Sequence, residues 1–288
     1  MIAVFRHEVS SYFSNVSGHV FGAFLLLFGG IYTMVINLNS GLANFEYVLS
    51  NMSFVFLIIV PILTMRVIAE ERRQKTDQLL YALPIGMTQV ALGKYLALLV
   101  VFLVPVGFIS LFPLILSAYG NVYLPAAYGA IAGFFFLGAA LIAIGMFISS
   151  VTESQAVSAG LCFVVMLVNY FMYDLTSYLP TTAYASLVAF DVAALLLGLV
   201  IYRLTRNFIA GASAAITIIV GLLVVFFVDS TLLAGTFADA VAWLSMFDRF
   251  YQFVEGVFDL TGIVYFISVT GVFLFLTVQS LEKRRWSE

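Results

Sequence analysis

Charged side chains gather in one short stretch between two apolar runs. Five of the twelve Lys and Arg residues fall within residues 65–94, and they are Arg66, Arg72, Arg73, Lys75 and Lys94. Glu71 stands four residues before Lys75, which is the favourable order for an ion pair along a helix. Apolar positions lie among the charges, and Pro84 ends the run. The stretch predicts a short amphipathic helix that lies against a membrane surface or docks a partner.

Two polar residues stand inside apolar runs. Asp191 is the one acid well within a predicted span, and ionisable residues in such positions commonly mark substrate, ion or proton pathways. Asn169 lies within another predicted span, where it either lines a cavity or makes a polar contact between helices. Both are candidate pathway residues, with a neutral, hydrogen-bonded Asp191 as the competing interpretation.

Signatures of several enzyme classes are missing. A phosphate-binding loop requires Gly-x-x-x-x-Gly-Lys-[Ser/Thr], but Gly93-Lys94 has no Gly five residues earlier and is followed by Tyr95. The chain therefore does not hydrolyse ATP by that machinery. No intramembrane-protease motif is complete, and the two His residues form no cluster with metal-ligand spacing. We expect neither a catalytic site nor a metal site.

The composition indicates which kind of secondary structure positions the candidate residues named above. With 63% hydrophobic and 9% charged residues and a mean hydropathy of +1.12, the chain is unlike a soluble domain, which carries roughly 25% charged residues. We expect the 288 residues to form one all-α integral membrane domain. The single cysteine, Cys162, excludes an intramolecular disulfide and fits as a small packing residue.

Apolar stretches predict about eight transmembrane helices. They cover residues 19–38, 51–65, 90–118, 125–149, 156–173, 184–204, 208–228 and 260–281. Eleven of the twelve Lys and Arg residues then fall on one side, which the positive-inside rule makes cytoplasmic, with both termini inside. The alternative is six spans, with residues 184–228 as an added hairpin or an overcount. Pro105 and Pro113 predict a kink in the third span, and Gly129-x-x-x-Gly133 permits close helix approach in the fourth.

Two segments outside the spans have amphipathic character. Residues 1–18 repeat apolar positions at helical spacing and predict an interfacial helix on the cytoplasmic surface. Residues 229–259 are too polar to span and too aromatic for a free loop, so Trp243, Phe247 and Phe250 are expected to dip into the outer leaflet. Arg249 in this segment either forms an ion pair worth ~0–1 kcal/mol or acts as a latch or a substrate contact.

The charged stretch resembles the coupling-helix region of type 2 ABC exporter permeases. The matching positions are Glu71, Arg72, Thr76, Leu79, Leu80, Pro84 and Lys94. In that family the loop, here residues 66–89, inserts into a groove on a separate ATPase subunit. The resemblance implies that the contacts to the ATPase are Glu70, Glu71, Arg72, Arg73, Thr76, Leu79, Leu80 and Pro84, with Glu153 in the second intracellular loop. The family usually has Gly where this chain has Lys75, a change that favours a longer helix.

The C-terminal part is similar to gliding-motility-type ABC permeases. The resemblance runs from Leu244-Ser245-x-Phe247-x-Arg249-Phe250 to Glu282-x-Arg284-Arg285-Trp286. Type 2 exporters place short re-entrant helices before the last span, where they form the outer gate. The resemblance implies that the gate residues here are Trp243, Phe247, Arg249, Phe250, Phe253 and Glu255.

The resemblance implies the permease subunit of an exporter in the cytoplasmic membrane of a prokaryote. ATP and Mg would bind a dimeric ABC ATPase on separate chains, with no cofactor on this chain and no nucleic acid as partner. A second permease subunit, identical or homologous, would complete the pathway through the bilayer, and an extracytoplasmic accessory subunit is also compatible with the resemblance.

Two other functions remain open. A proton-coupled secondary transporter would use Asp191, although no internal repeat is visible and no other acid lies deep in a span. A membrane scaffold that binds an ABC ATPase without transport would have the same coupling loop. The apolar walls and the aromatic outer segment fit a lipid, a hydrophobic peptide or a drug-like amphiphile as substrate.

Overall fold

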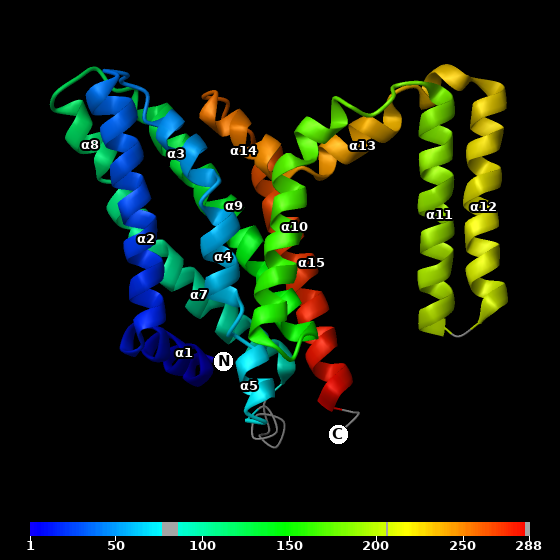
Figure 1. Cartoon of the computed structure of the whole chain (residues 1–288), viewed down its shortest axis with the longest axis horizontal. Coiled ribbons are helices and arrows are strands. Elements are labelled where there is room, and N and C mark those ends of the chain that lie inside the picture. The colour runs from blue at the N-terminus through cyan, green and yellow to red at the C-terminus, as the bar shows by residue number, and fades with distance from the viewer. Residues whose placement is uncertain (77–85, 206, 286–288) are drawn as a thin grey trace. The chain divides into compact units, whose positions relative to one another are not determined.

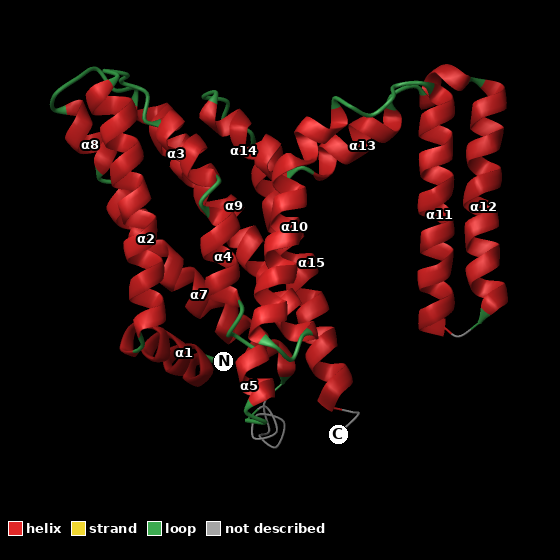
Figure 2. Ribbon diagram, viewed as in Figure 1, coloured by secondary structure: helices red, strands yellow, loops and turns green. Residues whose placement is uncertain are grey.

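A computed structural model describes residues 1–76, 86–205 and 207–285 of the chain. These residues form helices and contain no strand, which confirms the all-α prediction (Figures 1 and 2). The chain divides into two compact units. Unit 1 comprises residues 1–170 and 246–288, and unit 2 comprises residues 171–245.

The helices of the described residues are long and apolar enough for a multi-pass membrane protein. Six candidate spans are Gly18–Asn39, Met87–Ser117, Leu124–Val151, Gln155–Met172, Gly211–Val228 and Leu260–Arg285. The number rises to eight if each of two helix pairs forms one span, namely Glu46–Ser53 with Phe56–Thr64 and Ser230–Leu244 with Met246–Val254. This range includes both span numbers expected from the sequence, but the eight differ: the expected span at 184–204 corresponds to a shorter apolar helix, Ala183–Leu199, and one bent pair lies in the segment 229–259, which was expected not to span.

Unit 1 begins with a short helix followed by a span. The first helix, α1 (Ile2–Ser14), packs against α7 and ends four residues earlier than the predicted interfacial helix at 1–18. It ends because Asn15 is extended, at φ −94° and ψ 157°. The next helix, α2 (Val16–Thr33), continues into the π-helical segment η1 (Met34–Asn39).

The second span is broken, which corrects the continuous helix expected at residues 51–65. Its two parts are α3 (Glu46–Ser53) and α4 (Phe56–Thr64), and they meet at an angle of 59°. At the break, the Ser53 hydroxyl donates a hydrogen bond of 2.6 Å to the carbonyl oxygen of Ser50. In a continuous helix this carbonyl would accept from the amide of residue 54, so the serine side chain competes with the helix.

The third span breaks at one of its two prolines. Helix α7 (Met87–Ile109) contains Pro105 in its interior, and helix α8 (Phe112–Ser117) begins beside Pro113. Proline is well tolerated in the first turn of a helix, where its missing N–H costs no hydrogen bond. The predicted kink therefore takes the form of a break just before Pro113.

Helix α9 (Leu124–Val151) lies at the centre of unit 1 and is largely buried. It packs against α4, α7, α14 and α15. Its glycines make room for side chains of these neighbours, since a Cβ atom on Gly133 would lie 2.8 Å from Cγ of Phe253, and one on Gly145 would lie 2.3 Å from Oγ1 of Thr64. The close approach predicted at Gly133 is thus confirmed within the chain.

Three further helices belong to the described part of unit 1. They are α5 (Ala69–Arg73), α14 (Met246–Val254) and α15 (Leu260–Arg285), and the first part of α10 (Gln155–Thr176) also belongs to it. Helix α15 packs along α9 and is preceded by Asp259, whose carboxylate accepts from the amides of Thr261 at 2.9 Å and Gly262 at 3.1 Å. Figure 1 shows α1, α5 and the last turn of α15 at the same end of unit 1.

Unit 2 is built on an antiparallel helical hairpin. Helices α11 (Ala183–Thr205) and α12 (Phe208–Val228) pack together, followed by η2 (Ser230–Leu233) and α13 (Thr236–Leu244). The two long helices approach most closely at glycines, because a Cβ atom on Gly198 would lie 2.7 Å from the carbonyl oxygen of Gly211. Helix α13 packs on α11, where Phe237 meets Phe190 edge to face.

Candidate coupling site and outer segment

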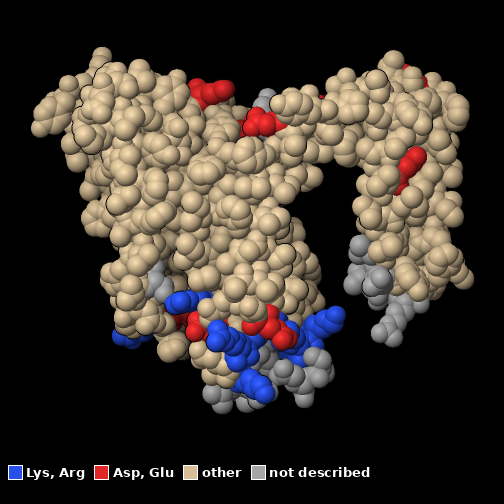
Figure 3. Space-filling view, viewed as in Figure 1, with Lys and Arg blue, Asp and Glu red and all other residues tan. Residues whose placement is uncertain are grey.

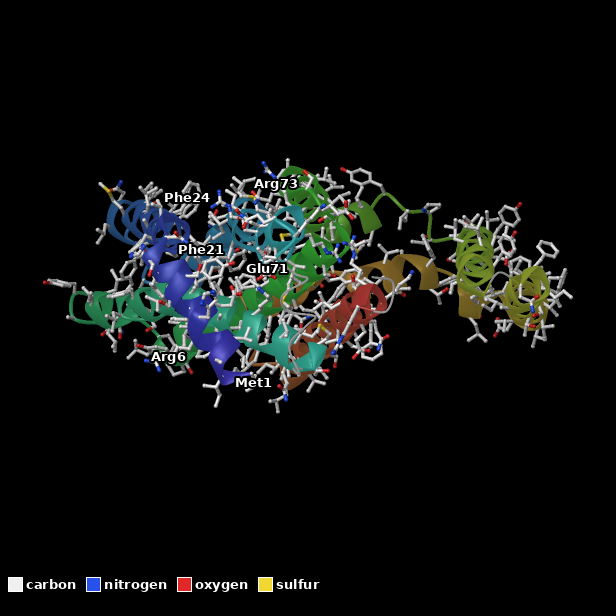
Figure 4. The ribbon with its side chains drawn as sticks, turned by 90° about the horizontal axis from the view of Figure 1, so that it is seen from below. Met1, Arg6, Phe21, Phe24, Glu71 and Arg73 are labelled. Carbon is white, nitrogen blue, oxygen red and sulfur yellow. The ribbon has the colours of Figure 1, made fainter. Side chains whose placement is uncertain are left out.

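Charged side chains gather at one end of unit 1 (Figure 3). This end, called the basic end below, carries Arg66, Arg72, Arg73, Lys94 and Arg284. Figure 4 views it from below, with Glu71 and Arg73 labelled together with Met1 and Arg6 of α1. The sequence predicted a coupling element here.

Lys94 joins three elements at the basic end. Its Nζ lies 2.6 Å from Oε1 of Glu8 on α1, 2.7 Å from Oε1 of Glu71 on α5 and 3.2 Å from the carbonyl oxygen of Val67. An ammonium group has three N–H donors, so these three acceptors satisfy all of them. Only 2% of the side chain is exposed, and such burial is tolerated because the charge is both paired and hydrogen-bonded.

Ser149 of α9 fixes the start of α5. Its Oγ accepts hydrogen bonds from the amides of Ile68 at 3.2 Å and Ala69 at 3.1 Å, and it donates to the carbonyl oxygen of Met65 at 3.3 Å. The first N–H groups of a helix have no partner within the helix itself. A side chain from another helix therefore takes the capping role for α5.

Arg72 binds the second predicted intracellular loop. Its side chain is buried, and Nη1 donates to the carbonyl oxygen of Thr152 at 3.2 Å. Glu71 and Arg72 of α5 thus bind neighbouring elements, Glu70 is partly exposed, and Arg73 and the following Thr76 are exposed. Of the residues predicted to contact an ATPase, Arg72 instead holds its own chain together.

The turn after α5 corrects two expectations. Lys75 adopts a left-handed backbone conformation with φ 58°, so it ends the helix rather than extending it. A left-handed residue is the usual role of glycine at this point of a helix, and Lys75 takes it despite its Cβ. The expected pair between Glu71 and Lys75 is replaced by the pair between Glu71 and Lys94. Leu79, Leu80 and Pro84 lie outside the described residues.

A second ion pair links the loop after α9 to α15. Nη2 of Arg284 donates to Oε1 of Glu153 at 2.8 Å, and the Ser280 hydroxyl donates to the carbonyl oxygen of Ser150 at 3.1 Å. The hydrogen bond and the positive charge of Arg284 lower the pKa of the Glu153 carboxyl below its ordinary value. Glu153 was predicted to contact an ATPase, and it remains largely exposed.

The outer segment is anchored in unit 1 by aromatic residues of α14. Phe247, Phe250 and Phe253 are buried, and Phe253 fits between Gly133 and Gly262. Phe250 meets Phe134 of α9 edge to face at a centroid distance of 6.0 Å. Three of the predicted gate residues therefore form part of the core and seal α14 against α9.

Asn169 sets the start of α14. Its Oδ1 accepts a hydrogen bond of 3.1 Å from the amide of Met246, so it makes a polar contact between helices, as one of its two interpretations held. Tyr251 reaches α3, with its hydroxyl 3.5 Å from Oγ of Ser53. The guanidinium of Arg249 lies over the ring of Tyr265 at 4.4 Å, which is a cation–π contact.

The remaining predicted residues are partly exposed or lie in unit 2. Trp243 is 72% exposed on α13 of unit 2, and Glu255 is exposed after α14. Asp191 lies on α11 of unit 2, where its Oδ1 is buried without a hydrogen-bond partner among the described residues. Five of the six predicted gate residues therefore belong to unit 1, and Trp243 belongs to unit 2.

Sequence reasoning missed several residues that the structure makes central. Lys94 was noted in the coupling motif but was given no role, because a lysine near the end of a span is expected to extend its ammonium group to the interface. Glu8 and Ser149 had no signal, since their partners lie far away in the sequence. Glu46, which lies between two expected spans, had no signal either, although it is only 4% exposed at the start of α3.

One protein-family model matches most of the chain. A model described as an ABC-2 family transporter protein matches residues 2–228. These residues include α1, α5, the hairpin of unit 2, and Lys94 with its partners Glu8, Glu71 and Val67, called the Lys94 cluster below. A comparison with curated proteins finds no match. Because the matched residues make up most of the chain, the protein belongs to the ABC-2 family of transporter proteins and is a multi-pass membrane permease.

Proposed function

We propose that the chain is the membrane-spanning permease subunit of an ABC exporter that a separate ATPase subunit drives. The observation that carries this proposal is the set of contacts that hold α5 against its neighbouring helices. Arg73 of α5 and the following Thr76 are exposed and Glu70 is partly exposed, so these residues can meet a partner, while Glu71 and Arg72 bind neighbouring elements of the chain. The chain itself has no phosphate-binding loop, so under this proposal the ATP is hydrolysed by another subunit.

The contacts of α5 suggest how a movement of the ATPase would be transmitted to the membrane-spanning helices. The Lys94 cluster connects α5 to α1 and α7, and Ser149 connects it to α9. A movement of α5 would therefore carry these helices as one body, and α9 contacts α14 at the other end through Gly133 and Phe253. Alternating access by rigid-body movement is the mechanism that this arrangement supports.

The orientation and partners follow from this proposal. The basic end would face the cytoplasm of a prokaryote, as the positive-inside rule requires, with both termini there. ATP and Mg would bind a dimeric ATPase, and a second permease subunit, identical or homologous, would complete the pathway. Residues 244–286 resemble gliding-motility-type permeases, which would allow an extracytoplasmic accessory subunit. The apolar spans that would line the pathway suit a lipid, a hydrophobic peptide or a drug-like amphiphile as the substrate.

Co-purification tests the proposal. The chain is expressed with the ABC ATPase of its own operon and reconstituted in nanodiscs, and ATP hydrolysis is measured. We expect a stable complex, and loss of either binding or coupled hydrolysis in the variant Glu70→Ala/Arg73→Ala/Thr76→Ala. The control is Lys283→Ala, which changes an exposed charge outside the coupling loop. A wild-type chain that purifies without any ATPase would contradict the proposal.

A second candidate is proton-coupled transport through Asp191. Its buried Oδ1, which has no hydrogen-bond partner among the described residues, lies within the apolar hairpin and is the observation in its favour. Under this alternative, Asp191→Asn abolishes proton-driven substrate uptake in proteoliposomes that contain no ATPase. Under the exporter proposal, proteoliposomes of the chain alone move nothing when a proton gradient is applied.

A further inference from the structure

An apolar groove lies between the start of α1 and the middle of α7 in unit 1. Its volume is about 420 Å³, within the range of ligand-binding pockets. Helix α1 contributes Ile2 and Phe5, and α7 contributes Leu96, Leu99 and Leu103. Every residue that lines the groove is apolar, so the groove favours an apolar occupant over a polar one.

The groove runs along the axis of a candidate membrane span. Leu96, Leu99 and Leu103 follow one another at intervals of three and four residues, so they form one stripe on α7. The stripe begins two residues after Lys94 of the basic end, and it extends along the helix for about 10 Å. Phe135 of α9 also lines the groove. A long apolar occupant would therefore lie parallel to the span, as an acyl chain does in a bilayer leaflet.

The groove is open on the side that a membrane would cover. Ile2 is 76% exposed and Leu103 is 52% exposed, and α7 belongs to a candidate span. Helix α1 packs closely on α7 at Gly93, where a Cβ atom would lie 3.2 Å from the Cβ of Val4. The groove therefore opens within one turn of α7 beyond this close contact, where lipid can enter it.

Arg6 places a positive charge beside the apolar side of α1 (Figure 4). It is exposed and has no ion pair or hydrogen bond among the described residues. In a helix of 3.6 residues per turn, Arg6 lies about 40° around the axis from Ile2 and about 160° from Glu8. Glu8 pairs with Lys94, and His7 lines a different cavity together with Glu8. The guanidinium of Arg6 is therefore available to an anion at the groove.

We propose that the groove binds an acyl chain of an anionic phospholipid whose phosphate group contacts Arg6. A guanidinium binds phosphate through two parallel hydrogen bonds, and an amphipathic helix in the membrane surface holds such a group at the depth of the lipid headgroups. The bound lipid fills the space between α1 and α7, and so stabilises the position of the helix that carries Glu8. This proposal concerns the lipid alone and does not depend on an ATPase partner.

Lipid binding to the full-length chain in mild detergent tests the proposal. The bound lipid is counted by native mass spectrometry during titration with phosphatidylglycerol or phosphatidylcholine that carry the same acyl chains. We expect the wild type to prefer phosphatidylglycerol by about fivefold, as one cation near a membrane surface provides. Arg6→Gln should remove this preference. Leu99→Trp fills the groove, and we expect it to lower the affinity for phosphatidylglycerol by about tenfold or more.

Two controls match these variants. Lys283→Gln removes an exposed cation from α15, and Val104→Trp adds the same ring to an exposed position of α7 outside the groove. Both should bind phosphatidylglycerol as the wild type does. Thermal unfolding of each variant separates loss of lipid from loss of folding, and Leu103→Trp replaces Leu99→Trp if the latter does not fold.

Each outcome supports or overturns the proposal. A wild type that binds the two lipids equally has only unspecific lipid around its spans, and the proposal is wrong. It is also wrong if Arg6→Gln keeps the preference for phosphatidylglycerol, or if the folded variant with the filled groove binds this lipid with wild-type affinity. Loss of the preference in Arg6→Gln, together with loss of binding in the filled variant alone among the two tryptophan variants, supports it.

Discussion

Lys94 and Glu71 are 23 residues apart in the chain, and their Nζ and Oε1 atoms lie 2.7 Å apart at the basic end. The pair fastens the coupling loop to the first turns of α7. Glu8 on α1 binds the same ammonium group, so one buried lysine joins three elements. The N-terminal helix and the coupling element are therefore parts of one assembly.

Replacing Lys94 should destabilise the protein more than replacing an exposed lysine. Lys94→Met leaves Glu8 and Glu71 facing each other without their cation, and we expect a loss of about 3 kcal/mol, at the low end for a buried pair because both carboxylates keep some exposure. Thermal unfolding in nanodiscs measures it, with Lys283→Met as the control. The triple variant Glu8→Gln/Glu71→Gln/Lys94→Met should recover part of the loss, and no recovery would mean that the lysine acts through packing alone.

Ser149 should matter more than its neighbour Ser150, although both are fully buried. Ser149→Ala removes the cap of α5, with an expected cost of roughly 1–2 kcal/mol. The Ser150 hydroxyl donates to the carbonyl oxygen of Phe147 within its own helix, so Ser150→Ala should cost much less. Hydrogen exchange of the amides at the start of α5 should increase only in Ser149→Ala. Equal effects of the two changes would speak against the capping role.

Lys75→Gly should stabilise the protein. A non-glycine residue in the left-handed region costs roughly 1–2 kcal/mol, and glycine avoids this strain but is more flexible when unfolded, so we expect a net gain below about 1 kcal/mol. The matched control is Gln74→Gly, which replaces a residue with ordinary right-handed backbone and should destabilise. If Lys75→Gly lowers the unfolding temperature as much as the control, the left-handed turn does not exist in solution.

The close approach of α9 and α14 can be tested with one methyl group. Gly133→Ala would place a Cβ 2.8 Å from the ring of Phe253, and overpacking of this kind costs roughly 1–3 kcal/mol. A methyl group on Gly107 in α7 would meet no atom within 4 Å, so Gly107→Ala should be neutral or slightly stabilising. Near-native stability of Gly133→Ala, with Phe253 unmoved, would disprove the packing.

The sequence predicted features that depend on local pattern. Hydropathy located the long apolar helices, and the last hairpin helix, α12, begins and ends where it was predicted, at Phe208 and Val228. The break between α3 and α4 was missed because residues 53–56 contain neither proline nor glycine to signal it. Lys75 was misjudged because its helix propensity argues for extension, while the fold requires a turn at that position.

Contacts between residues that are far apart in the sequence could not be predicted from local sequence pattern. The family resemblance identified Glu71 and Arg72 as contacts to an ATPase, and nothing near them in the sequence predicts their contacts with Lys94 and Thr152. In the same way, aromatic content marked Phe247 and Phe250 as interfacial, whereas Gly133 and Phe134 on α9 provide the space and the ring that bury α14.

The most direct test of the account asks whether ATP acts at the far end of unit 1 from the coupling loop. In a Cys162→Ala background, Tyr251→Cys places a thiol beside Ser53 at the base of α14, and Trp243→Cys provides an exposed control. Labelling by a membrane-impermeant maleimide is measured in the reconstituted complex with and without ATP and vanadate. The account predicts that nucleotide changes the labelling rate at residue 251 but not at residue 243, and that Lys94→Met removes the change. An unchanged rate at residue 251 in a complex that hydrolyses ATP would contradict it.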